Sequence, residues 1–150
     1  MNYHKIDKFN LVNGEGVRVV LWLSGCEHGC KGCHNPQTWN IKSGQPFGIE
    51  AKDEIYEELS KDYVHGITLS GGDPLHIANR EELLDLLMDI KQDFPNKTVW
   101  CYTGYTYEEV QDLEHLKYID VLVDGKYVEE LNTPKPQWCG SSNQRILRLK

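Results

Sequence analysis

Two apolar segments, each running directly into a glycine-rich loop, constrain the fold of this chain more than any other feature. Residues 18–24 (RVVLWLS) and 66–70 (GITLS) are short and rich in β-branched and apolar side chains, which is typical of buried strands. The first runs into a loop that carries three cysteines, and the second runs into residues 71–74 (GGDP). A chain of 150 residues can bury such strands in one hydrophobic core, so we expect a single domain over residues 1–150.

Helical patterns alternate with strand patterns along the rest of the chain. Residues 51–61 place apolar side chains on one helical face, and the leucines of residues 83–90 recur at helical spacing until Pro95 closes the segment. Further strands are expected at residues 97–103 and 119–123, with a candidate fifth strand at 145–149. This alternation predicts βαβ units, and therefore an α/β fold with a mainly parallel sheet.

Two capping boxes are predicted at helix starts. Asn79 with Glu82 would begin the helix that ends before Pro95, and Thr106 with Glu109 would begin a short helix near residues 107–116. Both glycine-rich loops leave the carboxyl ends of predicted strands. Because sites in such folds collect at those ends, we expect the two loops to open onto the same edge of the sheet.

The cysteine loop has a C-x3-C-x2-C spacing, with Cys26, Cys30 and Cys33 inside a glycine-rich segment. Thiolates are soft ligands that suit zinc, copper(I) and iron–sulfur clusters, and three of them can hold three irons of a four-iron cluster. A structural zinc site is the main alternative, and it would need a fourth ligand from His28, His34 or Cys139. Simple packing of buried thiols is the weakest interpretation.

Composition narrows the class of protein further. The formal net charge is −7, which argues against a nucleic-acid partner because such proteins concentrate Lys and Arg on one face. The polar start of the chain resembles no signal peptide, and no apolar run is long enough to cross a membrane. Three of the five cysteines lie within eight residues, unlike the spread of a disulfide framework, so we expect a cytoplasmic protein with no membrane contact.

The cysteine spacing resembles the signature of the radical S-adenosylmethionine enzymes. The resemblance implies an open partial (β/α) barrel and a [4Fe–4S] cluster on Cys26, Cys30 and Cys33, whose open iron binds S-adenosylmethionine. It further implies that a reduced cluster splits this cofactor into methionine and a 5′-deoxyadenosyl radical. Cofactor contacts are carried over to Gly32, Cys33 and His34 and to the second loop, Gly71, Gly72 and Asp73. Gly32 stands where many members carry an aromatic residue, and Asp73 stands where Glu is typical.

Four further segments resemble the glycyl-radical activases within that family. They are residues 12–18 (VNGEGVR), 35–39 (NPQTW), 122–127 (LVDGKY) and 140–145 (GSSNQR). The resemblance implies a protein partner, the large subunit of the anaerobic ribonucleoside-triphosphate reductase, and a one-electron donor such as flavodoxin or ferredoxin. An activator of another glycyl-radical enzyme, of the pyruvate formate-lyase type, is the runner-up. A ferredoxin that only transfers electrons is less compatible, since it would normally use four cysteines.

Several aromatic and thiol side chains have a less specific interpretation. Cys101 lies in an apolar strand pattern and is expected to pack in the core, and Cys139 is expected to be an adventitious free thiol. A set of aromatic residues could line an entrance for a partner, although simple packing is favoured for each one: Trp39, Tyr102, Tyr105, Tyr127 and Trp138.

Overall fold

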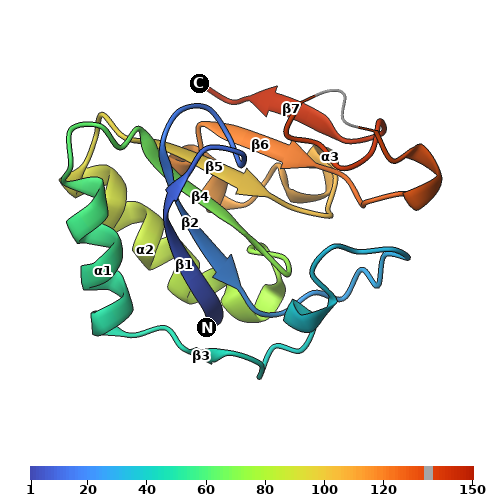
Figure 1. The fold of residues 1–150 in the computed structure, drawn as a ribbon, viewed down its shortest axis with the longest axis horizontal. Helices are drawn as coiled ribbons and strands as arrows, with labels where there is room; N and C mark the ends of the chain where they lie inside the picture. The colour runs from blue at the N-terminus through green and yellow to red at the C-terminus, as the bar shows by residue number, and fades with distance from the viewer. Residues whose placement is uncertain (134–136) are drawn as a thin grey trace.

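The structure is a computed structural model and describes residues 1–133 and 137–150. Within these residues, seven strands form one mixed sheet in the order β3-β1-β2-β4-β5-β6-β7 (Figure 1). The four central strands are β2 (Arg18–Leu23), β4 (Gly66–Gly71), β5 (Thr98–Tyr102) and β6 (Val121–Asp124). All neighbours among these four pair in parallel, so the predicted α/β fold with a parallel centre is confirmed.

The edges of the sheet are antiparallel. The candidate fifth strand is present as β7 (Arg145–Arg148), which pairs antiparallel with β6. At the other edge, β1 (Asn2–Asn10) pairs antiparallel with β2 and with the two-residue strand β3 (Gln45–Pro46). The sequence analysis did not predict β1 or β3.

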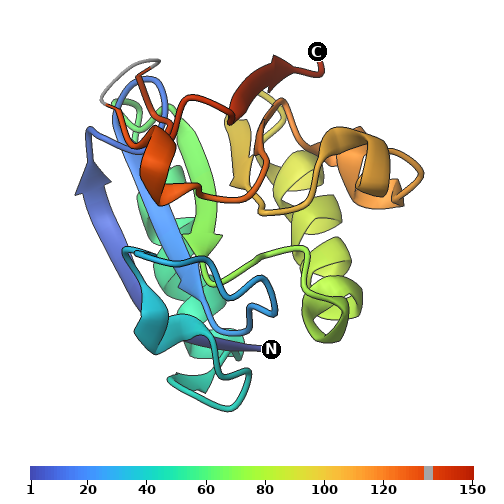
Figure 2. The same cartoon turned by 90° about the vertical axis from the view of Figure 1, so that its right-hand side faces the viewer.

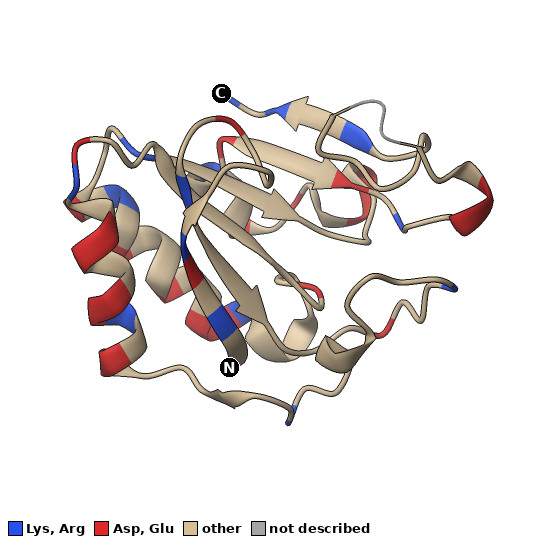
Figure 3. Cartoon of the chain, in the orientation of Figure 1, with Lys and Arg blue, Asp and Glu red and all other residues tan. Residues whose placement is uncertain are grey.

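The helices that connect the parallel strands lie on one face of the sheet (Figures 1 and 2). Helix α1 (Ile49–Leu59) follows β3, and α2 (Arg80–Asp93) joins β4 to β5. Their buried side chains pack with alternate residues of the strands, among them Leu21 of β2 and Leu69 of β4. Acidic residues are frequent along α1, as Figure 3 shows, while Ala51 and Ile55 of the same helix are buried.

The opposite face of the sheet carries a smaller and more polar layer. Trp100 of β5 and Val121 and Val123 of β6 form a separate buried cluster, against which Tyr102 and the tail residue Trp138 pack. Because side chains alternate along a strand, this face also receives the polar residues of β4, Thr68 and Ser70. The sheet therefore has one apolar face that the helices cover, and a second, more polar face that the helices leave uncovered.

The segment after β5 is helical over a shorter stretch than predicted. Helix α3 covers only Tyr107–Val110, and a 3₁₀ segment, η3 (Glu114–Tyr118), follows after an extended residue at Leu113. The capping box of Thr106 and Glu109 is confirmed, with both reciprocal hydrogen bonds present.

The second predicted capping box, Asn79 with Glu82, was wrong. A short 3₁₀ turn, η2 (Ile77–Asn79), leads into α2, so Asn79 already has helical dihedral angles. Its side chain donates instead to the carbonyl oxygen of Ser24 at 2.9 Å, which anchors the start of the cysteine loop. Among the described residues, no helix is long and apolar enough to span a membrane.

The amino ends of the parallel strands are closed by Arg18. This side chain is 1% exposed, and its five N–H groups donate to Thr68 Oγ1, Thr98 Oγ1 and three carbonyl oxygens, at 2.8–2.9 Å. The guanidinium also lies 5.6 Å from the ring centroid of Trp100. Burial lowers its pKa to about 10, with nearby Asp120 as the largest opposing influence.

Candidate functional site

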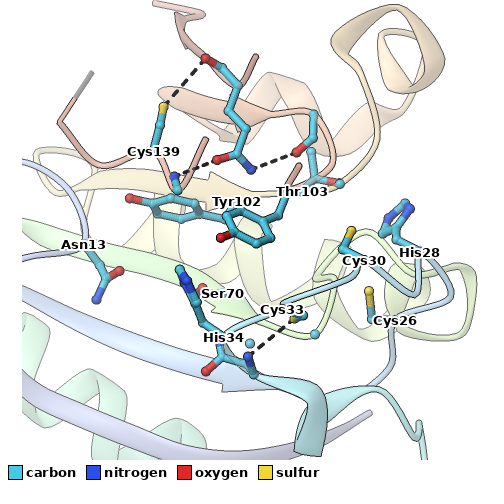
Figure 4. A pocket seen from close by; sticks show the side chains of 18 of the residues that line it. Asn13, Cys26, His28, Cys30, Cys33, His34, Ser70, Tyr102, Thr103 and Cys139 are labelled. Atoms are coloured by element: carbon cyan, nitrogen blue, oxygen red, sulfur yellow. Dashed lines mark hydrogen bonds between the residues drawn. The ribbon is translucent and has the colours of Figure 1, made fainter. Parts of the chain in front are cut away.

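A cavity of about 490 Å³ opens at the carboxyl ends of the parallel strands. This volume lies within the range of small-molecule sites, about 300–1,000 Å³. The cavity is lined by the cysteine loop, by the ends of β4 and β5, and by the tail that precedes β7. Figure 4 shows the three cysteines and His28 at one end and Cys139 at the other, with Tyr102 between them. The expectation that both glycine-rich loops reach the same edge of the sheet is confirmed.

Cys26, Cys30 and Cys33 all line this cavity as free, partly buried thiols. The loop that carries them turns sharply at Gly29 and Gly32, whose φ angles are 61° and 74°. Side-chain-bearing residues rarely adopt this left-handed region, so the glycines allow the loop to wrap tightly. The three thiols are thereby presented to one space from a segment of eight residues.

The cysteine loop is held against the second glycine-rich loop by backbone contacts. Asp73 N–H donates to the carbonyl oxygen of Gly25 at 2.6 Å, and Gly25 N–H donates to that of Thr38 at 2.7 Å. A Cβ at Gly72 would lie 2.6 Å from the Gly25 oxygen and 2.8 Å from the Thr38 oxygen. The second glycine of the pair is therefore required by the close approach of two backbones.

One of the three sulfur atoms, that of Cys33, accepts two hydrogen bonds. Cys33 Sγ accepts from the backbone N–H of Asn35 and from Trp39 Nε1–H, each at 3.4 Å. Burial raises the pKa of the Cys26 thiol to about 11, and a hydrogen bond from the backbone of His28 partly offsets that rise. Any metal ion that binds this sulfur must therefore displace its proton.

Asp73 lies beneath the cavity rather than in its wall. Its side chain is 2% exposed, and its two oxygens accept from Leu75 N–H, Thr103 Oγ1–H and Gly104 N–H, at 2.9–3.0 Å. The Oδ2 atom also accepts from His28 Nε2–H at 2.5 Å. Of the other residues expected to contact a cofactor, Gly71, Gly72, Cys33 and His34 line the cavity, whereas Gly32 packs near Glu129.

The end of the cavity away from the cysteines is aromatic. Tyr102, Tyr127 and Trp138 line it, as does the thiol of Cys139, which donates to the Gln144 carbonyl at 3.7 Å. Among the described residues, Tyr102 Oη and Trp138 Nε1 are buried without a hydrogen-bond partner. Burial raises the pKa of Tyr102, so its hydroxyl stays protonated and offers a donor. A ligand in the cavity can satisfy both polar groups.

The remaining aromatic and thiol candidates have separate roles. Tyr105 lies outside the cavity wall and packs edge-on against His28, with ring centroids 4.7 Å apart. Cys101 is fully buried on the helix-covered face, which confirms its expected packing role. Burial raises the pKa of that thiol well above its ordinary value.

The proposed fourth zinc ligands do not join the three cysteines. His28 Nε2 is bonded to Asp73, and the ring of His34 packs against Tyr127 with centroids 4.9 Å apart. Nowhere in residues 1–133 and 137–150 do three or more His, Cys, Asp or Glu side chains converge on a single metal ion. A [4Fe–4S] cluster spreads its ligands over separate irons, so three thiols around a cavity fit it better than they fit one zinc ion.

Sequence reasoning missed the contribution of the third loop, residues 103–105. Thr103 and Gly104 bind Asp73, and a Cβ at Gly104 would lie only 2.5 Å from the His28 ring. The available signal was that β5, like β2 and β4, ends in a glycine-containing loop at the same edge of the sheet. The donor role of Trp39 toward Cys33 left no pattern in the sequence.

Comparison with known families places the chain in a class. Residues 12–147 match the family described as a 4Fe-4S single cluster domain, so the chain belongs to the proteins that carry this domain. That match supports an iron–sulfur cluster over the zinc site that the sequence left open.

Curated relatives identify the family more specifically. The chain is 49% identical over 146 residues to the anaerobic ribonucleoside-triphosphate reductase-activating protein of Enterobacteria phage T4, covering 97% of this chain and 93% of that protein. It is 45% identical to the protein of the same name from Vibrio cholerae, covering 99% of both chains, and 43% identical to that of Escherichia coli, covering 100% of both. The chain therefore belongs to the family of anaerobic ribonucleoside-triphosphate reductase-activating proteins.

Proposed function

We propose that this chain is a radical S-adenosylmethionine activase that forms the glycyl radical of anaerobic ribonucleoside-triphosphate reductase. The observation that carries the proposal is the shared cavity. Three free thiols and the Gly71-Gly72 turn face one space at the carboxyl ends of parallel strands, in a chain that carries a 4Fe-4S single cluster domain. Nearly full-length relatives named for activation of that reductase supply the target.

Cys26, Cys30 and Cys33 are the proposed ligands of a [4Fe–4S] cluster, which leaves one iron without a protein ligand. When bound and reduced, such a cluster would supply the single electron needed for reductive cleavage of S-adenosylmethionine and, through it, for removal of a hydrogen atom from glycine. The Asn35 and Trp39 N–H groups stabilise the Cys33 thiolate.

The methionine end of S-adenosylmethionine is proposed to lie against Gly32, Cys33 and His34 and against the Gly71-Gly72 turn. Asp73 follows this turn, and both of its carboxylate oxygens accept hydrogen bonds from other groups of the protein. Tyr102 Oη and Trp138 Nε1 are two unpaired polar groups that cofactor or substrate can meet at the far end.

The arrangement of the sheet supports an open partial (β/α) barrel as the form of this single domain. Successive parallel strands β2, β4, β5 and β6 are added in one direction, and the helices lie on one face (Figure 2). The uncovered face then corresponds to the barrel interior, and its open edge leaves room for a glycine-bearing loop of the large subunit. A flavodoxin or ferredoxin is the proposed electron donor, and the cytoplasm is the proposed location.

Reconstitution tests this function directly. The protein is loaded anaerobically with iron and sulfide, then incubated with S-adenosylmethionine, a one-electron reductant and the large reductase subunit. We expect 5′-deoxyadenosine to form together with a glycyl radical signal in electron paramagnetic resonance. A matched subunit in which the radical-bearing glycine is replaced by alanine should give no such signal. Equimolar zinc without inorganic sulfide in the purified protein would contradict the proposal.

A further inference from the structure

The Asp73 carboxylate sits at a junction of three loops. It accepts hydrogen bonds from Thr103 and Gly104 after β5, from Leu75 in its own loop, and from His28 in the cysteine loop. With an exposed fraction of 2% and donors on both oxygens, the carboxylate has no free face toward the cavity. A charged group that is buried in this way is retained only where its hydrogen bonds are made by the protein.

His28 is the cysteine-loop end of this junction. It lies between two of the three thiols in the sequence, and its side chain is only 8% exposed. Its ring packs edge-on against Tyr105 and above Gly104, where any larger residue would collide with it. The position of the His28 ring is therefore coupled to the segment that carries Cys26 and Cys30.

We propose that Asp73 and His28 form a positioning pair that locks the cysteine loop onto the β4 and β5 loops, and that Asp73 is not a contact of the cofactor's amino group. The part of this proposal that concerns the cofactor rests on the proposed function. The contact between Asp73 and His28, by contrast, exists in the metal-free chain. The Asp73 side chain is one methylene shorter than that of Glu. It contacts His28 and does not line the cavity. Recognition of the methionine end is then left to the backbone of Gly71 and Gly72 and to the open iron.

Hydrogen exchange of the metal-free protein provides the first test, because it requires neither cluster nor cofactor. Asp73→Asn and His28→Ala should each raise the exchange of amides in residues 26–33 and 103–105 by about tenfold, as expected for the loss of a charge-assisted hydrogen bond. The double variant should show less than the sum of the two single effects, because both single changes remove the same contact. Asp53→Asn is the matched control. It makes the same chemical change at an exposed carboxylate of α1 and should leave exchange unchanged.

The protein loaded with its cluster provides a second measurement, the midpoint potential, which a merely structural role of the pair would leave unchanged. Asp73→Asn and His28→Ala should shift the midpoint potential of the cluster in the same direction, because both release the loop that carries Cys26 and Cys30. Asp73→Glu, which restores the charge but lengthens the side chain in a closed space, should not rescue either property.

Three outcomes would overturn the proposal. The first is wild-type exchange in metal-free Asp73→Asn with a loss of S-adenosylmethionine affinity in the loaded protein, which would make Asp73 a cofactor contact. The second is additive effects in the double variant, and the third is full rescue by Asp73→Glu. Failure of the proposed function, by contrast, would appear as absence of a cluster or of cofactor cleavage while the exchange pattern stayed as expected.

Discussion

The two ends of the parallel strands differ in how far their polar groups are paired. At the amino end, the buried Arg18 donates all of its N–H groups to defined acceptors and fills the space beneath Trp100. At the carboxyl end, free thiols and unpaired polar atoms surround a cavity. A satisfied polar network rigidifies a fold, whereas unpaired groups beside a cavity indicate a ligand.

This difference assigns stability to the amino ends of the strands and chemistry to their carboxyl ends. Barrel-type folds place catalytic groups at the carboxyl ends of strands and leave the amino ends for stability. Here the same strands serve both ends, since β2 carries Arg18 at its start and leads into the cysteine loop at its finish. Substitutions at the two ends should therefore have separable effects on unfolding and on cofactor chemistry.

The largest effect is expected from removal of a proposed cluster ligand. Cys26→Ala, Cys30→Ala or Cys33→Ala should each abolish S-adenosylmethionine cleavage, because a cluster held by two thiolates is labile. The measurement is 5′-deoxyadenosine formation, with the iron and sulfide content of each variant. Cys101→Ala is the control on the helix-covered face and should retain cleavage while losing about 1 kcal/mol of stability. Retained cleavage in any loop variant would remove that cysteine from the ligand set.

Arg18→Ala should show the reverse pattern. It leaves five acceptor contacts without a donor, so the free energy of unfolding should fall by about 3 kcal/mol or more. Urea denaturation of the metal-free protein measures this loss, and cofactor cleavage per folded molecule should be preserved. Arg148→Ala removes an exposed ion pair with Glu15 and should change stability far less. An unchanged urea midpoint for Arg18→Ala would show that the amino end is not the stabilising one.

Gly72→Ala should weaken the contact between the two loops at the carboxyl end. Its Cβ meets backbone oxygens of Gly25 and Thr38 that cannot rotate away, so we expect a cost of about 2 kcal/mol and faster iron loss to a chelator. Gly48→Ala adds the same methyl group where no atom lies within 4 Å and serves as the control. Equal iron retention in both variants would show that the loops do not need this close approach.

The smallest effect is expected from Trp39→Phe. The change keeps most of the ring but removes the N–H group that donates to Cys33 Sγ. Since such donors favour the more negative reduced cluster, its midpoint potential should fall slightly while the cluster stays bound. Potentiometric titration followed by electron paramagnetic resonance measures the shift. A rise in potential would contradict the donor role.

The sequence predicts the centre of the sheet better than its edges. The central strands have continuous apolar runs such as residues 19–23, because both of their faces are buried. Strand β1 reads NYHKIDKFN, and only Tyr3 of it is buried, so neither an apolar run nor regular alternation is present. The two residues of β3 are too few for any pattern, and their pairing depends on β1.

The site was predictable to the extent that it is local in sequence. The cysteine spacing and the Gly-Gly turn are each contained in one loop, and parallel strands bring the loops together. The contacts of Asp73 with His28 and Thr103 join residues 45 and 30 positions apart, so no local pattern records them. Asn79 illustrates the same limit, since its side chain binds Ser24 instead of capping its own helix.

The most direct test of the carboxyl-end site is electron paramagnetic resonance of the reconstituted, reduced protein with and without S-adenosylmethionine. If the three cysteines hold a [4Fe–4S] cluster with one open iron in this cavity, a reduced four-iron signal should appear and change shape when the cofactor is added. A signal that is indifferent to the cofactor, or no cluster signal after reconstitution, would contradict the assignment of this cavity to radical chemistry.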